Sequence, residues 1–449
     1  MSLGSLHYIT LGCAKNEVDT DRMRSLLSAA GYTETDSPQE AAAVLINTCS
    51  FLAAATTESL EATFEVAREA DGLTRRPQII MCGCVPSRYG QELNAELPEV
   101  AAFVNTREED AIVSVVDSVL GIKRSEPPHL PKVKRTVESA VAYLKISDGC
   151  DRFCSFCAIP YIRGAYQSRS AAQILAEAQE LVAGGVRELV LIGQDTGVWG
   201  SDFDERQGAT GPKNLAQLLV YLAEALREQQ VWIRVLYLQP EGMTEELVAA
   251  IRDTPEVLPY IDIPVQHVSK HVLADMNRTG SEAELRELFR WLRSEIPHMV
   301  IRTTYLAGFP GETDKDAEDM LHFMTDLSFD YTSVFAYSRE EGTSAYDMDN
   351  QVADDVILAR TQAGLDVAEE LGFASTAAHV GETALVLIDG IDEGDEGPEL
   401  IGHAWFQAPD SDGAVHLPLG EASVGDIVMV KFDDSVCYEL MGHVVRGTE

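Results

Sequence analysis

The sequence predicts an α/β protein with three domains: a doubly wound amino-terminal domain, a partial barrel of six βα units and a small carboxy-terminal β-barrel. Two observations predict this architecture. Strand-like apolar runs alternate with segments of helical periodicity over most of the 449 residues. The last segment instead has short strand-like runs separated by Gly and Asp clusters. A chain of this length buries more than one core, and the expected domain limits are 5–122, 136–375 and 378–447.

The amino-terminal segment predicts a parallel sheet with helical crossovers, because each strand-like run is followed by helical periodicity. The predicted strands are His7–Leu11, Val44–Asn47, Gln78–Met81 and Phe103–Asn105. The predicted helices are Val18–Ala30, Ala53–Ala70, Arg88–Glu96 and Glu108–Leu120. Pro127, Pro128 and Pro131 mark a linker to the next domain.

The middle segment predicts six βα units. Its predicted strands are Val141–Ser147, Glu188–Gly193, Trp232–Leu238, Tyr260–Val265, Val300–Ala307 and Tyr331–Tyr337. Helical periodicity is found in Ala171–Ala183, Leu215–Glu228, Glu245–Arg252, Glu282–Glu295 and Asp314–Asp326. Six units are too few for an ordinary eight-fold barrel of about 250 residues. We therefore expect an open barrel with its site at the carboxyl ends of the strands.

The last segment predicts a small β-barrel that follows a helix over Asp354–Leu371. Its four predicted strands are Ala384–Asp389, Ala414–Leu417, Asp426–Phe432 and Tyr438–Val445.

Three cysteines, Cys150, Cys154 and Cys157, directly follow the first predicted barrel strand. Three thiolates can hold a cubane iron–sulfur cluster and leave one iron open to a reactant, whereas an electron carrier closes its cluster with a fourth cysteine. The spacing therefore predicts chemistry at a cluster. A structural zinc site fits less well, because it needs a fourth Cys or His and no nearby His supplies one.

A second set of cysteines comes from three consecutive strand ends of the amino-terminal domain: Cys13, Cys49 and Cys84. Such strand ends converge at one edge of a parallel sheet. Any single one could be a buried core thiol, but three at matching positions favour a second cluster. We expect Cys84 to be the ligand, Cys82 to be a packed thiol and Cys437 to lie in the core of the last domain.

Glycine-rich segments follow the second and fifth barrel strands, namely Gly193–Gly197 and Gly308–Thr313. Missing side chains would let a cofactor approach the backbone there, although such runs also simply form turns. Neither segment has the form of a phosphate-binding loop. Gln266 and His267 follow the fourth strand, where a lone His is more often a structural residue hydrogen-bonded to a loop carbonyl.

The charge is strongly negative, with 73 acidic against 34 basic residues and a net charge of −39. The last segment, from Gly381 to Glu449, has only Lys431 and Arg446 as basic residues. Such a field disfavours stable nucleic-acid binding and favours a basic partner. We find neither a membrane-spanning run nor a signal peptide, and the sparse cysteines fit a reducing compartment. We therefore expect a cytoplasmic protein.

Together these motifs resemble a known family. The Cys150-x3-Cys154-x2-Cys157 run, with Phe156 before its last cysteine, is similar to the signature of radical S-adenosylmethionine enzymes. The three upstream cysteines resemble those of its methylthiotransferase branch, and the last segment resembles a TRAM domain. The segments 149–164, 193–196, 262–267 and 336–343 are most similar to members that modify an aspartate of a ribosomal protein. Members that act on transfer RNA carry a Gln-Ser-Gly-Ser type run where this chain has Gln266-His267-Val268-Ser269.

The resemblance implies two [4Fe-4S] clusters, S-adenosylmethionine and an external electron donor. The cluster on Cys150, Cys154 and Cys157 would bind S-adenosylmethionine and cleave it to a 5′-deoxyadenosyl radical. The cluster on the upstream trio would carry a methylated sulfur to the β-carbon of an aspartate in protein twelve of the small ribosomal subunit. Such a basic partner would suit the acidic chain. The resemblance also implies cofactor contacts from Phe156, Gly193, Gln194, Gln266 and Glu312.

Three alternatives remain open. A transfer-RNA adenosine methylthiotransferase would have the same clusters, but the acidic last segment and the Gln266-His267 pair oppose it. A non-catalytic iron–sulfur carrier would need a fourth ligand for each cluster, and only Cys82 could serve one of them. A radical enzyme with a single cluster would follow if the upstream trio were structural.

Overall fold

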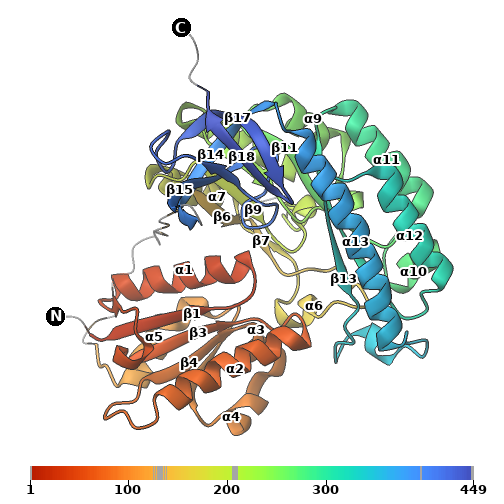
Figure 1. Ribbon diagram of the computed structural model, residues 1–449. Coiled ribbons are helices and arrows are strands. Elements are labelled where there is room, and N and C mark those ends of the chain that lie inside the picture. Colours follow the sequence, from red (N-terminus) through yellow and green to blue (C-terminus); the bar gives the residue numbers. More distant parts are fainter. Residues whose placement is uncertain are drawn as a thin grey trace.

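The computed structural model describes residues 3–124, 126, 128, 135, 137, 139–204, 211–394 and 397–445 (Figure 1). Most of the proline-marked linker, including Pro127 and Pro131, lies outside these residues. The predicted fold class is confirmed: two parallel sheets with helical crossovers are followed by a closed β-barrel. None of the helices in the described ranges combines the length and apolar character that a membrane crossing requires.

The amino-terminal domain is a five-stranded parallel sheet in the order β2-β1-β3-β4-β5. Its strands are β1 (Ser5–Thr10), β2 (Thr33–Glu34), β3 (Ala43–Thr48), β4 (Gln78–Gly83) and β5 (Val100–Asn105). Helices α1 (Ala14–Ala29) and α5 (Ile112–Leu120) pack on one face, while α2 (Ala53–Glu69), α3 (Cys84–Tyr89) and α4 (Leu93–Glu96) pack on the other. The strands β1, β3 and β4 are therefore neighbours at the centre of the sheet.

The middle domain is an open six-stranded parallel sheet in the order β13-β12-β11-β10-β9-β6. Its strands are β6 (Val141–Lys145), β9 (Glu188–Ile192), β10 (Trp232–Val235), β11 (Val257–Gln266), β12 (Val300–Ala307) and β13 (Tyr331–Ala336). One face is covered by α7 (Ala171–Ala183), α8 (Leu215–Leu226), α9 (Glu245–Asp253), α11 (Glu282–Glu295) and α12 (Asp314–Leu327). A short ribbon of β7 (Ser147–Asp148) and β8 (Gln167–Ser168) and the short helices α6 (Ile159–Ile162) and α10 (Lys270–Asp275) lie near the carboxyl ends of the strands.

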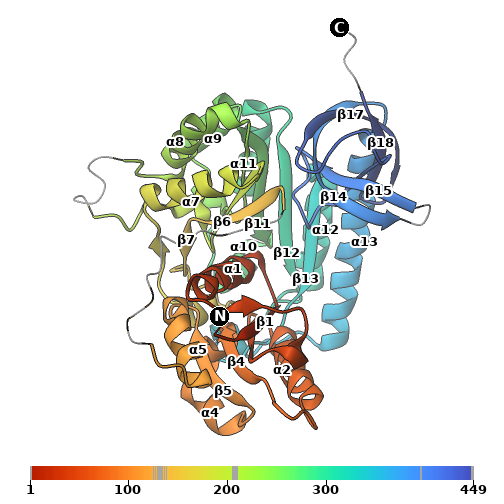
Figure 2. The ribbon, with the colours of Figure 1, turned by 90° about the vertical axis from the view of Figure 1, so that its left-hand side faces the viewer.

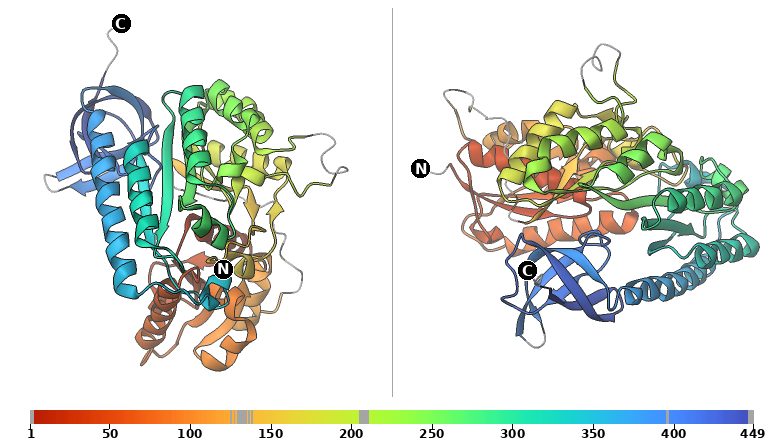
Figure 3. Two further views of the ribbon diagram at one scale, coloured as in Figure 1. Left: turned by 90° about the vertical axis from the view of Figure 1, so that its right-hand side faces the viewer. Right: turned by 90° about the horizontal axis from the view of Figure 1, so that it is seen from above.

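The carboxy-terminal barrel covers part of the other face of this sheet (Figure 3). Helix α13 (Asp354–Ala378) packs along β13 and leads into the barrel, which closes in the order β14-β15-β16-β18-β17. The barrel strands are β14 (Thr383–Gly394), β15 (Gly397–Ala404), β16 (Val415–Leu417), β17 (Ile427–Val436) and β18 (Glu439–Val444). Trp232 and Tyr260 of the sheet share a core with Val386 and Phe432 of the barrel. Because the barrel is docked by apolar burial, it is part of one framework with the sheet.

The structure corrects three details of the sequence prediction. The helical pattern over Arg88–Glu96 is broken into α3 and α4 at Gly90, which has a left-handed φ of 61°. The last domain has a fifth strand, β15, that the sequence did not predict. Cys437 is exposed rather than buried, because it occupies a tight turn between β17 and β18 with φ of 55°.

Candidate active site

The amino-terminal trio lies where three neighbouring strands end. Cys13 follows β1 and precedes α1, Cys49 follows β3, and Cys84 is the first residue of α3 after β4. Gly12, with φ of 101°, turns the chain so closely that a Cβ there would meet the Cys49 Sγ at 3.0 Å. Three thiols from distant parts of the sequence are thus brought to one edge of the sheet.

A single amide side chain, that of Asn16, organises this trio. Its Oδ1 lies 3.9 Å from the Cys13 Sγ and 4.0 Å from the Cys84 Sγ. Its Nδ2 donates to the backbone oxygens of Leu11 at 2.7 Å and Thr48 at 2.9 Å. Asn16 therefore ties the loops that follow β1 and β3 together beneath the cysteines, a role that the sequence prediction missed.

Burial raises the pKa of the Cys49 thiol, and it raises that of Cys84 to about 12, although the nearby Arg163 guanidinium lowers the Cys84 pKa in part. Both thiols are therefore neutral at pH 7 until a metal competes with the proton. Since a metal ligand must be a thiolate, loading this site releases protons. Cys82 is instead packed in the sheet core with 1% exposure, as expected for a packed thiol.

The barrel trio lies in one loop, after β7. Gly149, with φ of 77°, starts the loop, and a Cβ there would meet the Ala165 backbone oxygen at 2.2 Å. The Cys150 N–H donates to the Gly164 oxygen at 3.1 Å, and the Cys157 N–H donates to the Cys154 oxygen at 3.0 Å. The loop is thus folded by its own backbone, and all three cysteines keep partial exposure.

Two neighbouring segments clamp this loop. The Asn277 amide donates to the backbone oxygens of Arg152 at 3.0 Å and Phe153 at 3.1 Å. The Ser155 N–H donates to the Met276 oxygen at 3.1 Å. Burial raises the pKa of the Cys157 thiol to about 12, so this trio also needs a metal to become ionised.

A small hollow of about 220 Å³ opens beside Cys154. It is lined by Arg152, Glu241, Asn277, Arg278 and Thr279 in addition to the cysteine. Arg152 forms ion pairs with Asp195 and with Glu241, the latter at 3.0 Å. The hollow therefore presents fixed charges of both signs, which suits a zwitterionic ligand.

The residues expected to contact the cofactor lie near the carboxyl ends of the middle-domain strands. We call this edge of the sheet the rim. Phe156 packs against the apolar cluster that contains Phe309. Gly193 is so close to β7 that a Cβ would meet the Ser147 Oγ at 2.4 Å. The Gln194 Oε1 is buried with no hydrogen-bond partner among the described residues. Gln266, with φ of 66°, ends β11.

Glu312 is held by the protein itself. Its carboxylate accepts hydrogen bonds from the Gly308 N–H at 2.7 Å and the Arg360 guanidinium at 3.0 Å. His267 is a structural residue, because its Nδ1 accepts from the N–H groups of Val268 at 2.9 Å and Ser269 at 3.0 Å. These donors are backbone amides rather than the loop carbonyl that the sequence suggested as its partner.

A buried ionic network joins the two trios. Arg163, with 2% exposure, donates to the Asn16 Oδ1 at 2.8 Å and to the Asp19 carboxylate at 3.0 Å. It also lies 3.4 Å from Asp148, which directly precedes the loop of the barrel trio, and Lys145 pairs with both Asp19 and Asp148. A second buried pair, between Arg88 and Glu340 at 3.1 Å, joins the same two domains. The two cysteine sets therefore belong to one rigid region.

The described residues contain no group of three His, Cys, Asp or Glu side chains placed around a single metal ion. In a cubane each thiolate binds a different iron, so three thiols that hold one need not surround a single ion. The all-cysteine donor sets, with three members each, match that group in chemistry.

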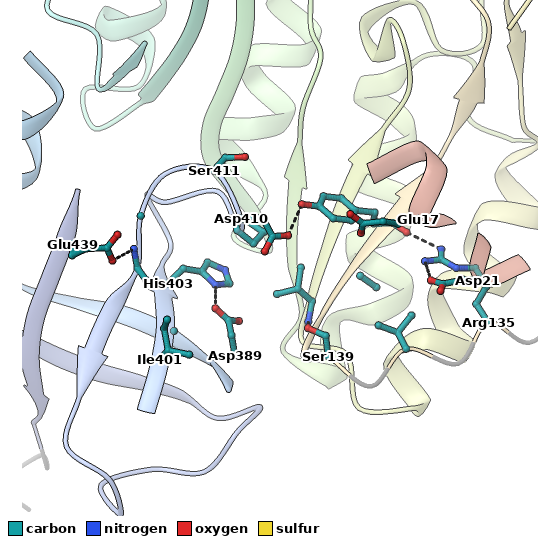
Figure 4. A pocket seen from close by; sticks show the side chains of 18 residues that line it. Glu17, Asp21, Arg135, Ser139, Asp389, Ile401, His403, Asp410, Ser411 and Glu439 are labelled. Carbon is teal, nitrogen blue, oxygen red and sulfur yellow. Dashed lines mark hydrogen bonds and ion pairs between the residues drawn. The ribbon is translucent and has the colours of Figure 1, made fainter. Parts of the chain in front are cut away.

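A separate cavity of about 680 Å³ lies between α1, β6 and the carboxy-terminal barrel (Figure 4). Its acidic lining residues are Glu17, Asp21, Asp389, Asp410 and Glu439. Arg135 pairs with Asp21 at 3.2 Å, and His403 pairs with Asp389 at 2.6 Å. None of the cysteines is among its described lining residues, so it is distinct from the two cysteine sets.

Comparison with known proteins identifies the family. Models of the Radical SAM superfamily, of Uncharacterized protein family UPF0004 and of the TRAM domain match residues 144–324, 5–105 and 380–445. The chain is 41% identical to the "Ribosomal protein uS12 methylthiotransferase RimO" of Geotalea uraniireducens, over 97% of each chain. It is 38% identical to the protein of that name from Geobacter sulfurreducens, over 97% of this chain and 98% of the relative. The chain belongs to the RimO family of radical S-adenosylmethionine methylthiotransferases. A further RimO, from Synechococcus sp., is 39% identical over 98% of this chain and 89% of the relative.

Solved structures show the same fold at low sequence identity. The radical S-adenosylmethionine methyltransferase TsrM from Kitasatospora setae aligns with a TM-score of 0.56 and 12% identity, over 82% of this chain and 89% of TsrM. The cobalamin-dependent radical enzyme OxsB aligns with a TM-score of 0.51 and 11% identity, over 81% of this chain and 56% of OxsB. These alignments establish the fold alone. The RimO assignment comes from the sequence relatives.

Proposed function

We propose that this enzyme transfers a methylthio group to the β-carbon of an aspartate in ribosomal protein uS12. One observation carries the proposal: two three-cysteine sets lie on adjoining loops and are joined by the buried Arg163 network. Relatives named for this activity are 38–41% identical over nearly the whole chain. The proposal takes the domains to be 5–122, 136–375 and 378–447, and the matched family models lie inside these limits.

In this proposal Cys150, Cys154 and Cys157 hold one [4Fe-4S] cluster, and Cys13, Cys49 and Cys84 hold a second. When bound, the two clusters supply reductive cleavage of S-adenosylmethionine and a sulfur donor, with electrons from an external donor. Phe156, Gly193, Gln194, Gln266 and Glu312 line the rim where S-adenosylmethionine would lie. Glu312 acts by fixing the Gly308 turn, since its carboxylate is already engaged.

The protein itself positions the two cysteine sets. Asn16 and Arg163 fix the loops of the donor trio against the barrel. The left-handed glycines Gly12 and Gly149 allow backbone turns that a side chain would block. Because a radical reacts with any nearby C–H bond, holding the two reactive sites in one rigid region restricts the reaction to the intended carbon.

The substrate partner is expected to be basic. The net charge of −39 and the acidic cavity between α1, β6 and the carboxy-terminal barrel favour a positively charged protein surface. The same charges repel the phosphates of transfer RNA. Free cysteines as metal ligands fit a reducing compartment, so we place the reaction in the cytoplasm.

The test is a modification assay with two substrates. Reconstituted enzyme is incubated with S-adenosylmethionine, a strong reductant and either uS12 or transfer RNA, and the products are analysed by mass spectrometry. We expect methylthio addition to uS12 only. Replacing a cysteine of either trio by Ala should abolish the modification. Cys437→Ala is the matched control for these variants, since Cys437 is exposed and remote from both trios in the fold. Modification of transfer RNA instead of uS12 would replace the proposal by the nucleic-acid alternative, and modification of neither would reject it.

A further inference from the structure

Lys15 is a buried cation beside the amino-terminal trio. It lies two residues after Cys13 in the first turn of α1, and it is only 7% exposed. Its Nζ lies over the ring of Tyr237, 3.2 Å from the ring centroid. Within the described parts of the chain, its ammonium group has neither a hydrogen bond nor an ion pair, so the N–H donors that do not face the ring are available to a ligand.

Tyr237, the aromatic partner of Lys15, lies at the rim of the middle-domain sheet. Tyr237 follows β10 in a left-handed conformation, with φ of 62°. Its N–H donates to the Asp262 carboxylate at 3.1 Å, and its carbonyl accepts from the Thr196 N–H at 3.1 Å. Thr196 ends the segment that begins with Gly193, at the carboxyl end of β9. The Lys15 ammonium therefore lies between the donor trio and the rim expected to bind S-adenosylmethionine.

An unpaired ammonium in such a place is unfavourable. Removing an ion from water costs more free energy than a cation–π contact returns. The other cations of this region already have carboxylate partners: Lys145 and Arg163 pair with Asp19 and Asp148, and Arg302 pairs with Asp412. Burial raises the pKa of the nearby Asp262 carboxylate, and Arg302 and Lys15 lower it in part. Lys15 forms no ion pair with Asp262 among the described residues, so it is the member of this set that is left to bind an anion from outside the chain.

We propose that Lys15 binds the side-chain carboxylate of the substrate aspartate and thereby holds its β-carbon between the two cysteine trios. The inference rests on the proposed function and extends it by naming the residue that selects an acidic side chain. The β-carbon is directly bonded to that carboxylate, so fixing the carboxylate fixes the reacting carbon. Tyr237 keeps the ammonium in place through the face of its ring, and the N–H groups that point away from the ring stay free for a substrate carboxylate.

The test compares Lys15→Met with Lys15→Arg, using uS12 that carries either Asp or Asn at the modified position. Methionine keeps an unbranched chain but removes the charge, and arginine keeps the charge. We expect Lys15→Met to reduce kcat/KM for the Asp substrate about 10- to 100-fold, as for loss of a charge-assisted hydrogen bond. We also expect its preference for Asp over Asn to disappear, while Lys15→Arg retains that preference. Lys213→Met, at an exposed lysine outside the site, should behave as wild type.

Two further readouts separate this role from cofactor binding or folding. Iron content and the substrate-free cleavage of S-adenosylmethionine should be unchanged in Lys15→Met. The inference is overturned if Lys15→Met keeps the wild-type preference for Asp, or if it loses iron or the cleavage of S-adenosylmethionine. Failure of the proposed function gives a different result, because wild-type enzyme would then leave both forms of uS12 unmodified.

Discussion

The two cysteine sets differ in how the chain brings them together. Cys150, Cys154 and Cys157 share one short loop that is folded by its own backbone hydrogen bonds. Cys13, Cys49 and Cys84 come from the ends of β1, β3 and β4 and meet only because these strands are neighbours in the sheet. The comparison shows that a local site is encoded by spacing, whereas a distributed site is encoded by topology and by the side chains that lock the strand ends together.

The surroundings of the two sets differ in the same way. The barrel loop is clamped by side chains and amides within the middle domain, such as Asn277 and Ser155. The amino-terminal trio depends on Asn16 and, through it, on Arg163 from the other domain. Figure 2 shows α1, which carries Asn16, between the amino-terminal sheet and the strands of the middle domain. We therefore expect the distributed site to be the more sensitive to changes at the domain interface.

The largest expected effect separates the chemical roles of the two sets. Cys154→Ala should abolish cleavage of S-adenosylmethionine and, with it, all modification of uS12. Cys49→Ala should retain cleavage but lose methylthio transfer, because only the donor site is damaged. Quantifying 5′-deoxyadenosine and modified uS12 in the same reactions measures both. Equal loss of cleavage in both variants would show that the two sets do not have separate roles.

The next effect tests the interface that supports the distributed site. Arg163→Met leaves the Asp19 carboxylate, which has 4% side-chain exposure, without its guanidinium partner. Asp19 keeps Lys145 as its second partner, so the cost should stay below the about 3–5 kcal/mol that is typical of a fully broken buried pair. The urea midpoint should still fall, and iron should be lost first from the amino-terminal trio. The control is Arg252→Met, which removes an exposed pair with Asp253 and should change neither quantity. Preferential loss of the barrel cluster would contradict the expected order.

A third effect concerns the interface between the carboxy-terminal barrel and the middle-domain sheet. This interface lies apart from both trios. Burial alone would lower the pKa of His403, but Glu188 and Asp389 raise it from 6.5 to about 9. Burial alone would raise the pKa of Glu188, but Arg234 and His403 lower it to about 2. Both groups are therefore charged at neutral pH and form a buried ion pair between the barrel and the sheet.

The sign of the pH dependence follows from the raised histidine pKa. The folded state binds the His403 proton more tightly than the unfolded state, so this stabilisation is complete below about pH 6.5 and is lost as the pH rises through about 9. The change is on the order of 3 kcal/mol. Urea unfolding of wild type and His403→Gln from pH 6 to pH 10 measures the difference, which should shrink toward high pH. A difference that does not change with pH would contradict this ion pair.

The smallest expected effect lies in α7, on the helical face of the middle-domain sheet. Ser170 caps α7 in a reciprocal capping box with Gln173. Ser170→Ala should lower the free energy of unfolding by about 1 kcal/mol, with iron content and cleavage unchanged, because α7 packs against β6 and α8 and carries none of the six cysteines. Denaturant unfolding and iron analysis together check this. A loss of iron in this variant would show that the local site depends on global stability rather than on its own loop.

The same contrast explains what could be predicted from the sequence. The periodic runs predicted the two parallel sheets, and the strand-end positions of Cys13, Cys49 and Cys84 predicted their convergence. The sequence pattern did not predict β15, because this strand forms through its pairing with β14 and β16. The roles of Asn16, Lys15 and Arg163 could not be predicted: Asn16 joins strand ends that are distant in the sequence, and the contacts of Lys15 and Arg163 depend on how one domain docks on another. Contacts of this kind leave no pattern in the local sequence.

Each trio is proposed to hold its own cluster, and iron content tests this most directly. Iron and sulfide per chain are measured in reconstituted wild type, in a variant with Cys13, Cys49 and Cys84 changed to Ala, and in one with Cys150, Cys154 and Cys157 changed to Ala. We expect about eight irons in the wild type and about four in each variant, with all three proteins eluting as folded monodisperse species. About four irons in the wild type, with no loss on removing the amino-terminal trio, would contradict it.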